Sequence, residues 1–265
     1  MGSRTRFAAR YGPVALVAGA AEGLGAAFAR ALAARGLDLV LVDVHAPHSL
    51  AGELSRAHGV RATAVALDLG QQGVGATALR LTEELEIGLV VYNAAFAPMG
   101  PWLLQSLADQ QRTLDVNARG ALELAQAFAP AMVARGHGGL LFVGSLAGLI
   151  AHPTTAVYGA SKAFLVRLGE GLGEELQPHG VHVLVACPGA VRTPGFERSG
   201  AKLPRSLVAA PADVAERSLE RLGADAPVTV IGAGNRLALG VLRALPRRFA
   251  VAMLGRMMRR IYGRS

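Results

Sequence analysis

"PVALVAGAAEGLGAAFARALAARG", residues 13–36, joins a short apolar run to a helix-like stretch through a glycine-rich turn. The run 13–19 is apolar throughout, which is typical of a strand covered on both faces of a parallel sheet. Gly19, Gly23 and Gly25 follow a G-x-x-x-G-x-G spacing in the turn. Glycines there permit positive φ and let the backbone approach a pyrophosphate, which the free N–H groups of the next helix attract. The strand before the turn and the helix after it favour dinucleotide binding over an ordinary glycine-rich turn.

Six further apolar runs follow, and none of them alternates with polar residues. They lie at 38–43, 61–67, 87–93, 139–145, 181–187 and 227–232. Helix-like stretches separate them, at 24–35, 49–58, 74–86, 103–135, 156–177 and 211–222. This alternation predicts an α/β fold, a single Rossmann-type doubly wound parallel sheet of about seven strands with helices on both faces. We expect residues 1–265 to form one domain, with 233–265 as a basic helical C-terminal tail.

The composition sets limits on the class of protein. The chain has 265 residues and is 52% hydrophobic, enough for the core of one large α/β domain. Its single cysteine, Cys187, allows no internal disulfide and indicates a reducing compartment, so we expect a cytoplasmic protein. Residues 1–12 lack the apolar core of a signal peptide. No run of eighteen apolar residues predicts a membrane span.

The formal net charge of +8 comes from one end of the chain. No acidic residue follows Asp225, whereas eight of the 27 basic residues do. Residues 1–225 therefore hold 19 basic and 19 acidic residues, a neutral body with a basic tail. This distribution argues against a nucleic-acid-binding face across the domain.

Two carboxylates bear on the choice of cofactor. Asp43 ends the second predicted strand, where an acidic residue about 20 positions after the glycine turn would bind both ribose hydroxyls of NAD. A helix-capping or turn aspartate is the alternative interpretation. Glu22 lies within the glycine turn with no arginine or lysine beside it. Two carboxylates facing the adenosine ribose would repel a 2′-phosphate, so we expect NAD rather than NADP.

Residues 157–172, "VYGASKAFLVRLGEGL", hold a tyrosine and a lysine on one predicted helix face. Tyr158 and Lys162 lie four positions apart, and Lys202 is the only other lysine, against 25 arginines. A tyrosine hydroxyl has a pKa of about 10, too high for efficient proton transfer at neutral pH. A nearby ammonium would lower that pKa, and lysine offers a compact charge on a flexible stem. Ser145 ends the fifth predicted strand, at the carboxyl edge of the sheet, where its hydroxyl can hold a substrate oxygen.

Six motifs resemble those of the classical short-chain dehydrogenase/reductase family in their order and spacing. They are "AGAAEGLG", "YNAA", "DVNARG", "GSLAGL", "YGASK" and "CPGAVRT", within residues 12–232. The resemblance implies a single Rossmann domain that interconverts alcohols and carbonyl compounds. It makes Tyr158 the general acid/base, and Ser145 the residue that orients the substrate oxygen. It makes Lys162 the ribose anchor and modifier of the tyrosine pKa, and Asn117 the residue that holds a helix kink and a relay water.

The same resemblance implies a set of cofactor contacts. The residues expected at NAD are Gly19, Gly23, Leu24, Gly25, Asp43, Asp68, Asn93, Tyr158, Lys162, Pro188, Gly189 and Thr193. Among them, Asp68 matches the adenine contact and Asn93 the residue lining the cofactor cleft. Thr193 matches the contact to the nicotinamide carboxamide.

The chain departs from the family's pattern at supporting positions. Ala18 stands where a threonine is usual before the first glycine of the turn, which removes a structural hydrogen bond. Tyr92 replaces the first asparagine of the N-N-A-G motif, and Ala95 replaces its glycine. A longer basic tail follows the last strand in place of the family's common glycine-rich end.

The segments expected to line the substrate pocket are apolar. "AFAPMGPW" (95–102) and "LAGLIAHPTT" (146–155) contain no acidic or basic residue except His152. They favour a lipophilic alcohol or ketone of steroid, terpenoid, aryl or fatty-chain type. Four basic residues in the loop after the sixth predicted strand argue against a purely apolar substrate: Arg192, Arg198, Lys202 and Arg205. One of them could bind a carboxylate or a coenzyme A phosphate. The histidines have no ligand spacing, so no metal site is expected.

Two functions from different classes fit these observations. The first is an NAD-dependent oxidoreductase that interconverts a lipophilic secondary alcohol and its ketone, acting as a homodimer or homotetramer. The second is a catalytically silent dinucleotide-binding regulator on the same fold. The presence of all four expected catalytic residues favours the enzyme, because a regulator that only binds a dinucleotide does not need all of them. They are Ser145, Tyr158, Lys162 and Asn117.

The tail from about 247 to 262 has the pattern of an amphipathic helix. Its apolar residues gather on one side: Val251, Leu254, Met257, Met258 and Ile261. Its arginines gather opposite: Arg248, Arg256, Arg259 and Arg260. We expect this helix either to dock on a membrane surface or a partner subunit, or to pack on its own domain with a solvated basic face.

Overall fold

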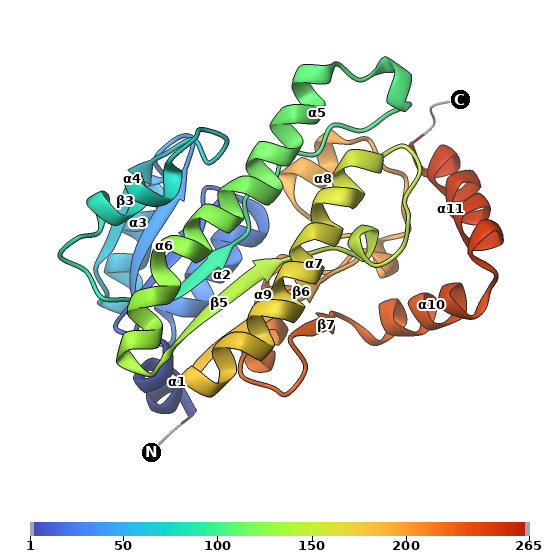
Figure 1. The fold of residues 1–265 in the computed structure, drawn as a ribbon. Coiled ribbons are helices and arrows are strands. Elements are labelled where there is room, and N and C mark those ends of the chain that lie inside the picture. Colours follow the sequence, from blue (N-terminus) through green and yellow to red (C-terminus); the bar gives the residue numbers. More distant parts are fainter. Residues whose placement is uncertain (1–2, 263–265) are drawn as a thin grey trace.

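A computed structural model describes residues 3–262. Seven strands form one parallel sheet in the order β3-β2-β1-β4-β5-β6-β7 (Figure 1). The strands are β1 (Val14–Ala18), β2 (Asp38–Asp43), β3 (Ala62–Ala66), β4 (Ile87–Tyr92), β5 (Gly138–Val143), β6 (Val181–Cys187) and β7 (Val228–Val230). The predicted doubly wound α/β fold is confirmed. The strand order reverses between β1 and β4, and open α/β sheets bind ligands outside the carboxyl ends of such strands.

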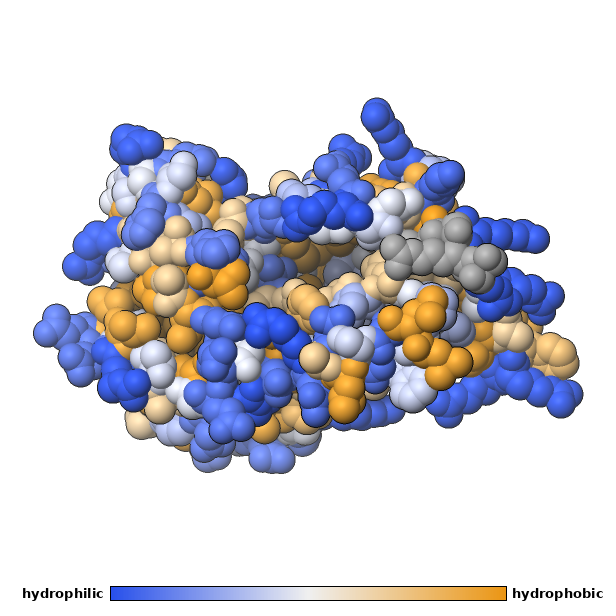
Figure 2. Space-filling view, turned by 90° about the horizontal axis from the view of Figure 1, so that it is seen from above, coloured by the Kyte–Doolittle hydropathy of each residue, from blue (hydrophilic) through white to orange (hydrophobic). Residues whose placement is uncertain are grey.

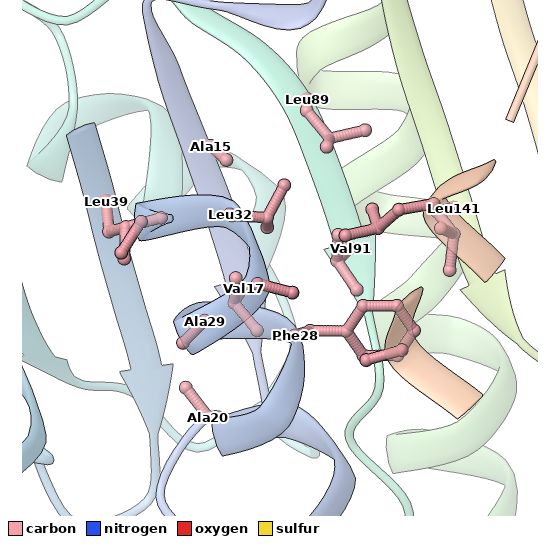
Figure 3. Close-up of a cluster of buried hydrophobic side chains, with 14 of the residues drawn as sticks. Ala15, Val17, Ala20, Phe28, Ala29, Leu32, Leu39, Leu89, Val91 and Leu141 are labelled. Atoms are coloured by element: carbon pink, nitrogen blue, oxygen red, sulfur yellow. The ribbon is translucent and has the colours of Figure 1, made fainter. Parts of the chain in front are cut away.

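The strands are apolar on both sides because helices cover both faces of the sheet. On one face lie α2 (Gly23–Ala33), α3 (His48–His58) and α9 (Pro211–Arg221), and on the other α4 (Val74–Leu81), α6 (Gly120–Arg135) and α7 (Ala156–Leu176). Strand β1 contributes side chains to the core on both faces of the sheet. Val17 packs in the first layer, under α2, α3 and α9, and Leu16 packs in the second, under α4, α6 and α7. Figure 3 shows the first layer, where Phe28 of α2 lies close to Val91 of β4.

The predicted helix 103–135 is not continuous, and this part of the prediction was wrong. The segment divides into η1 (Trp102–Leu104), α5 (Leu107–Leu114), the π-helical turn η2 (Asp115–Arg119) and α6. Ser106 begins α5 by accepting a hydrogen bond from the backbone N–H of Asp109, at 3.0 Å. The widened turn η2 is stabilised by tertiary contacts of Asn117, which the periodicity of the sequence does not report.

Several other elements differ from the predicted ones. Helix α4 ends at Leu81, five residues before the predicted end, and β5 ends at Val143, so that Ser145 follows the strand rather than ending it. Two helices were not predicted, α1 (Ser3–Tyr11) and α8 (Pro194–Arg198). Short 3₁₀ turns complete the chain: η3 (Leu146–Gly148), η4 (Gln177–His179) and η5 (Arg205–Leu207).

The tail forms two helices, α10 (Ala233–Ala244) and α11 (Arg247–Tyr262). Helix α11 matches the predicted extent, but it packs on its own chain, with Ala250, Leu254 and Met258 buried. The predicted apolar face is therefore only partly correct, because Met257 is 45% exposed. Within residues 3–262, no helix combines the length and the apolar character that crossing a membrane requires.

Candidate active site

The predicted site residues gather at the carboxyl edge of the sheet. Figure 2 looks down on this edge and shows a hollow in the middle of the face. The loops that follow β1, β4, β5 and β6 meet here, because the carboxyl ends of parallel strands share one edge.

The glycine turn is built for close backbone contacts. Gly19 has φ +79°, and a Cβ on Gly25 would lie 1.8 Å from the carbonyl oxygen of Gly19. The Asn93 amide donates to that same oxygen at 2.8 Å, which ties β4 to the turn. No larger side chain fits at Gly25, so the turn presents its backbone N–H groups as a cradle for a pyrophosphate. Leu24 is buried in the core, which leaves only its backbone for a cofactor.

The loop after β6 closes on the glycine turn. A Cβ on Gly23 would lie 2.9 Å from Cγ2 of Thr193, the residue that caps α8 by accepting from the backbone N–H of Phe196. Pro188 and Gly189 precede it, and a Cβ on Gly189 would lie 2.7 Å from Oδ1 of Asn235 in α10. The structure thus brings Thr193 to the glycine turn, while its contact to the carboxamide stays a prediction, and it adds Asn235, which the sequence analysis missed.

The ribose corner contains the two predicted carboxylates and one unexpected arginine. Asp43 is held by the backbone N–H groups of Ala21 at 2.9 Å and Val44 at 2.8 Å. Glu22 was expected to lie without a basic neighbour, and this was wrong. Arg198 of α8 forms an ion pair with Glu22, with Nη2 and Oε1 2.5 Å apart. The contact spans 176 positions, which is why the local sequence around Glu22 does not show it.

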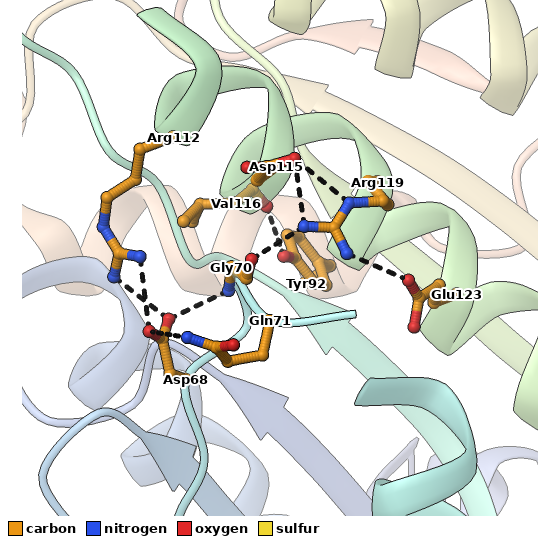
Figure 4. A network of polar contacts seen from close by, with 9 residues as sticks. All are labelled: Asp68, Gly70, Gln71, Tyr92, Arg112, Asp115, Val116, Arg119 and Glu123. Carbon is orange, nitrogen blue, oxygen red and sulfur yellow. Dashed lines mark hydrogen bonds and ion pairs between the residues drawn. The ribbon is translucent and has the colours of Figure 1, made fainter. Parts of the chain in front are cut away.

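Asp68 is held in a network of polar contacts (Figure 4). Arg112 donates to both of its carboxylate oxygens, at 3.0 and 3.2 Å, and the backbone N–H of Gly70 donates at 2.9 Å. Partial burial raises the pKa of Asp68, but the hydrogen bonds from Arg112 and Gly70 outweigh that effect and hold it below its usual value. The carboxylate therefore stays charged and fixed in place, and Arg112 is a further residue that the sequence analysis missed.

Two side chains explain the widened turn η2. Asn117 is fully buried; its Oδ1 accepts from the N–H of Phe96 at 2.7 Å, and its Nδ2 donates to Ser161 Oγ at 3.0 Å. Asn117 lies in the π-helical turn itself, and its expected roles at a helix kink and a relay water stay predictions. Tyr92, which replaces the family's asparagine, donates its hydroxyl to the carbonyl of Val116, and burial raises the pKa of this phenol. The substitution thus supports the same turn from β4.

Lys162 lies completely inside the protein, one turn after Tyr158 on α7. Its Nζ donates to the carbonyl oxygen of Val143 at 2.7 Å and lies 5.7 Å from the centre of the Tyr158 ring. Burial lowers the pKa of the ammonium to about 8. The slender lysine side chain can cross this packed layer and place one charge beside the Tyr158 ring. The planar guanidinium of an arginine is wider and needs more hydrogen-bond partners.

The segment with Ser145 packs against the first turns of α7. Ser145 caps η3 by accepting from the N–H of Ala147 at 3.1 Å. A Cβ on Gly148 would lie 2.6 Å from the backbone of Lys162, and one on Gly159 would lie 3.1 Å from the carbonyl oxygen of Ala147. These close backbone contacts pack the segment that carries Ser145 against the turn of α7 that carries the half-buried Tyr158.

The segments expected to line the substrate pocket hold little charge. Burial lowers the pKa of His152 below its usual value, so its imidazole is neutral at neutral pH. In the part of the chain that the structure describes, no three His, Cys, Asp or Glu side chains come together in a group that could hold a metal ion.

Comparison with known proteins agrees with this geometry. The family model described as short chain dehydrogenase matches residues 13–203. The chain belongs to the short-chain dehydrogenase family. The oxidoreductase UcpA of Escherichia coli K12 is 35% identical over 187 residues, 69% of this chain and 71% of that protein. This short-chain dehydrogenase is therefore an oxidoreductase.

Two solved structures resemble this short-chain dehydrogenase closely. A 7β-hydroxysteroid dehydrogenase superposes with a TM-score of 0.88 at 26% identity, covering 94% of this chain and 99% of the other. A short-chain dehydrogenase from Sphingobium yanoikuyae, in complex with NADPH, gives a TM-score of 0.77 at 31% identity, covering 89% and 97%. The first similarity spans nearly the whole of this chain.

Proposed function

We propose that this short-chain dehydrogenase interconverts a lipophilic secondary alcohol and its ketone, with NAD as cofactor and Tyr158 as the general acid/base. The observation that carries the proposal is the buried ammonium of Lys162, held by the Val143 carbonyl beside the Tyr158 ring. A buried charge is costly to maintain, and structural packing alone does not call for one here. Its use is to lower the pKa of the phenol and ease proton transfer at neutral pH.

The residues present fit a nicotinamide dinucleotide. The glycine turn would hold the pyrophosphate, Asp43 the adenosine ribose, and Lys162 the ribose nearer the nicotinamide, with Asp68 at the adenine and Thr193 at the carboxamide. When bound, the nicotinamide ring exchanges a hydride with the carbon of the substrate. Ser145 orients the substrate oxygen, and the Tyr158 hydroxyl gives that oxygen a proton in reduction or takes one in oxidation. Asn117 fixes the position of Ser161, which lies one turn after Tyr158 and directly before Lys162.

NAD is proposed over NADP because Asp43 is fixed by two backbone N–H groups at the ribose corner. A carboxylate binds the two ribose hydroxyls and repels a 2′-phosphate. Arg198 weakens the preference by neutralising Glu22. The preference is tested by comparing kcat/KM for NAD and for NADP in the unmodified enzyme and in Asp43→Ser. We expect the difference between the two cofactors to be smaller in Asp43→Ser. Equal values in the unmodified enzyme would contradict the proposal.

The proposed substrate follows from the lining of the pocket. Segments 95–102 and 146–155 bear no charge at neutral pH, and a relative of this fold acts on hydroxysteroids. The test is a panel of alcohols and ketones matched for the reacting group and differing in polarity. We expect steroid, terpenoid, aryl or fatty-chain compounds to be turned over faster than small polyols. A preference for polyols would contradict the assignment.

We also propose a homodimer or homotetramer. Leu114, Leu122 and Phe164 lie on α5, α6 and α7 and are 46%, 43% and 38% exposed. Apolar side chains of this size on neighbouring helices are typical of an interface between subunits. Light scattering after size exclusion gives the mass, and a monomer would contradict this part of the proposal.

The alternative, a catalytically silent dinucleotide-binding regulator, is weaker. A regulator needs the glycine turn and Asp43 but not a buried lysine beside a tyrosine. Cofactor binding without turnover of any compound in the panel would favour it.

A further inference from the structure

A line of exposed apolar side chains runs along the two tail helices. They are Leu237 (72% exposed), Val241 (55%), Leu245 (38%), Phe249 (52%), Met253 (43%) and Met257 (45%). Within each helix the members lie four residues apart, which is the spacing of one helix face, and the chain bends between the two helices. Helix α10 carries the first two and α11 the last three, with Leu245 between the helices. We call this line the tail stripe.

The tail stripe is separate from the face of α11 that packs on the domain. That other face buries Ala250, Leu254 and Met258, and a Cβ on Gly255 would lie 3.3 Å from Pro153. The backbone N–H of Lys202 donates to the carbonyl oxygen of Ile261 at 3.0 Å. Helix α11 is thus fixed to the body of the protein, and the stripe is an outward face left uncovered.

Helix α10 is covered even less. Leu239 is its only fully buried residue among the twelve that the structure describes. Figure 1 shows α10 leading away from the edge strand β7, and α11 turning back beside the loops at the carboxyl edge. An amphipathic helix with so little of its apolar surface packed is typical of a contact surface for another partner.

The surroundings of the tail stripe are strongly basic. Seven exposed arginines lie on the same two helices: Arg236, Arg243, Arg247, Arg248, Arg256, Arg259 and Arg260. No acidic residue follows Asp225 in the sequence. Within residues 3–262, none of the seven forms an ion pair with a carboxylate. The positive charge of the tail is therefore not neutralised by the protein itself.

We propose that the tail stripe docks on a membrane that carries anionic lipid, with the apolar side chains in the interface and the arginines at the headgroup phosphates. Interfacial helices combine apolar burial with attraction to anionic lipid in this way. A second copy paired symmetrically through the same surface would set arginines against arginines, which is unfavourable. A negatively charged surface is the complementary partner.

Docking would place the membrane beside the pocket. Helix α11 contacts Pro153, in the pocket segment 146–155, and Lys202, in the loop after β6. A lipophilic substrate dissolved in the bilayer could then enter the pocket directly from the membrane. This consequence rests on the proposed function. The docking itself does not depend on the substrate, and its test needs no turnover.

The experiment is vesicle flotation with the full-length protein. One set of vesicles is phosphatidylcholine alone, and the other contains about 30 mol% phosphatidylserine. We expect binding to the anionic vesicles, little binding to the neutral ones, and a loss of binding as salt shortens the screening length. No flotation with anionic vesicles at low salt would overturn the proposal.

Matched variants test the surface itself. Phe249→Ser/Met253→Ser should lower the partition coefficient at least tenfold. Leu79→Ser/Leu81→Ser, which removes leucines of nearly equal exposure (42% and 52%), should not change it. A similar loss in both variants would contradict the proposal.

The charges are tested separately from the apolar residues. Arg256→Gln/Arg260→Gln should weaken binding roughly tenfold or more, at about 1 kcal/mol per charge near an anionic surface. Arg80→Gln/Arg217→Gln, on other exposed helices, is the control with the same change in net charge. Light scattering on every variant gives the oligomer mass. A lower mass in the tail variants with unchanged flotation would assign the stripe to a second copy and overturn the membrane proposal.

Discussion

Arg198 Nη2 lies 2.5 Å from Glu22 Oε1, so that an arginine of the loop after β6 neutralises a carboxylate of the glycine turn. Asp43 accepts a hydrogen bond from Ala21, the residue next to Glu22, at 2.9 Å. The ion pair therefore lies at the ribose corner and bears on cofactor choice, although its two partners are 176 positions apart.

Removal of the arginine should sharpen the preference for NAD. In Arg198→Ala, Glu22 presents its full charge at the corner, and a 2′-phosphate loses a nearby cation. We expect the ratio of kcat/KM for NAD to that for NADP to rise by a few-fold and not by orders of magnitude, because the pair is exposed. Glu22→Gln should lower the same ratio. Arg167→Ala, which breaks an exposed pair with Glu170 on α7, is the control, and an unchanged ratio in Arg198→Ala would contradict the assignment.

Loss of the Tyr158 hydroxyl should abolish turnover and spare cofactor binding. General acid–base contributions are about 10²–10⁴-fold, so kcat of Tyr158→Phe should fall by that factor. Dinucleotide affinity, measured by fluorescence quenching, should stay within about twofold because the ring and Lys162 remain. Tyr11→Phe is the control, since its hydroxyl contacts His182 far from the site at 2.9 Å. More than a tenth of the wild-type kcat in Tyr158→Phe would refute the catalytic role.

Lys162→Met should separate activity from stability. Turnover should fall at least about 10²-fold because the phenol loses its neighbouring charge. The free energy of unfolding should not fall, since an apolar side chain of similar length replaces a buried charge.

The pH dependence of stability gives a second measurement on the same variant. Burial lowers the pKa of Lys162 from 10.5 to about 8, so between these pH values the unfolded chain binds a proton that the folded protein has released. The contribution of Lys162 to the free energy of unfolding therefore rises with pH across this window, by roughly 1–3 kcal/mol. Chemical denaturation from pH 7.5 to 10.5 should show this rise in the wild type relative to Lys162→Met. Parallel pH curves for the two proteins would show that burial does not lower the pKa of Lys162.

Gly25→Ala should eliminate dinucleotide binding. The new Cβ would lie 1.8 Å from the Gly19 carbonyl oxygen, so the turn must open. Gly171→Ala on α7 is the matched control, because no atom lies within 4 Å of its new Cβ. That control should bind normally and gain about 0.5–1 kcal/mol of stability, as glycine is unfavourable inside a helix. Wild-type affinity in Gly25→Ala would contradict the assignment of the turn.

The seven strands and their parallel arrangement could be predicted from the sequence, and so could the candidate site apart from Arg112 and Asn235. These follow from local signals: uninterrupted apolar runs, a glycine spacing between a strand and a helix, and a tyrosine and lysine one turn apart. Strand ends were predicted to within a few residues, and β2 and β6 have the predicted bounds. Local patterns are enough to predict strands and helices, because burial of a strand on both faces and the periodicity of a helix both show in neighbouring residues.

Features that depend on contacts between distant segments could not be predicted from the sequence. The turn η2 exists because buried Asn117 bonds Phe96 and Ser161, and no periodicity records that. The charge at the ribose corner depends on the ion pair that Arg198 forms with Glu22. The exposed face of α11 depends on which residues of the helix pack against the domain. An ion pair or a packed face forms where the fold brings two surfaces together, so its partners are set by geometry and not by their spacing along the chain.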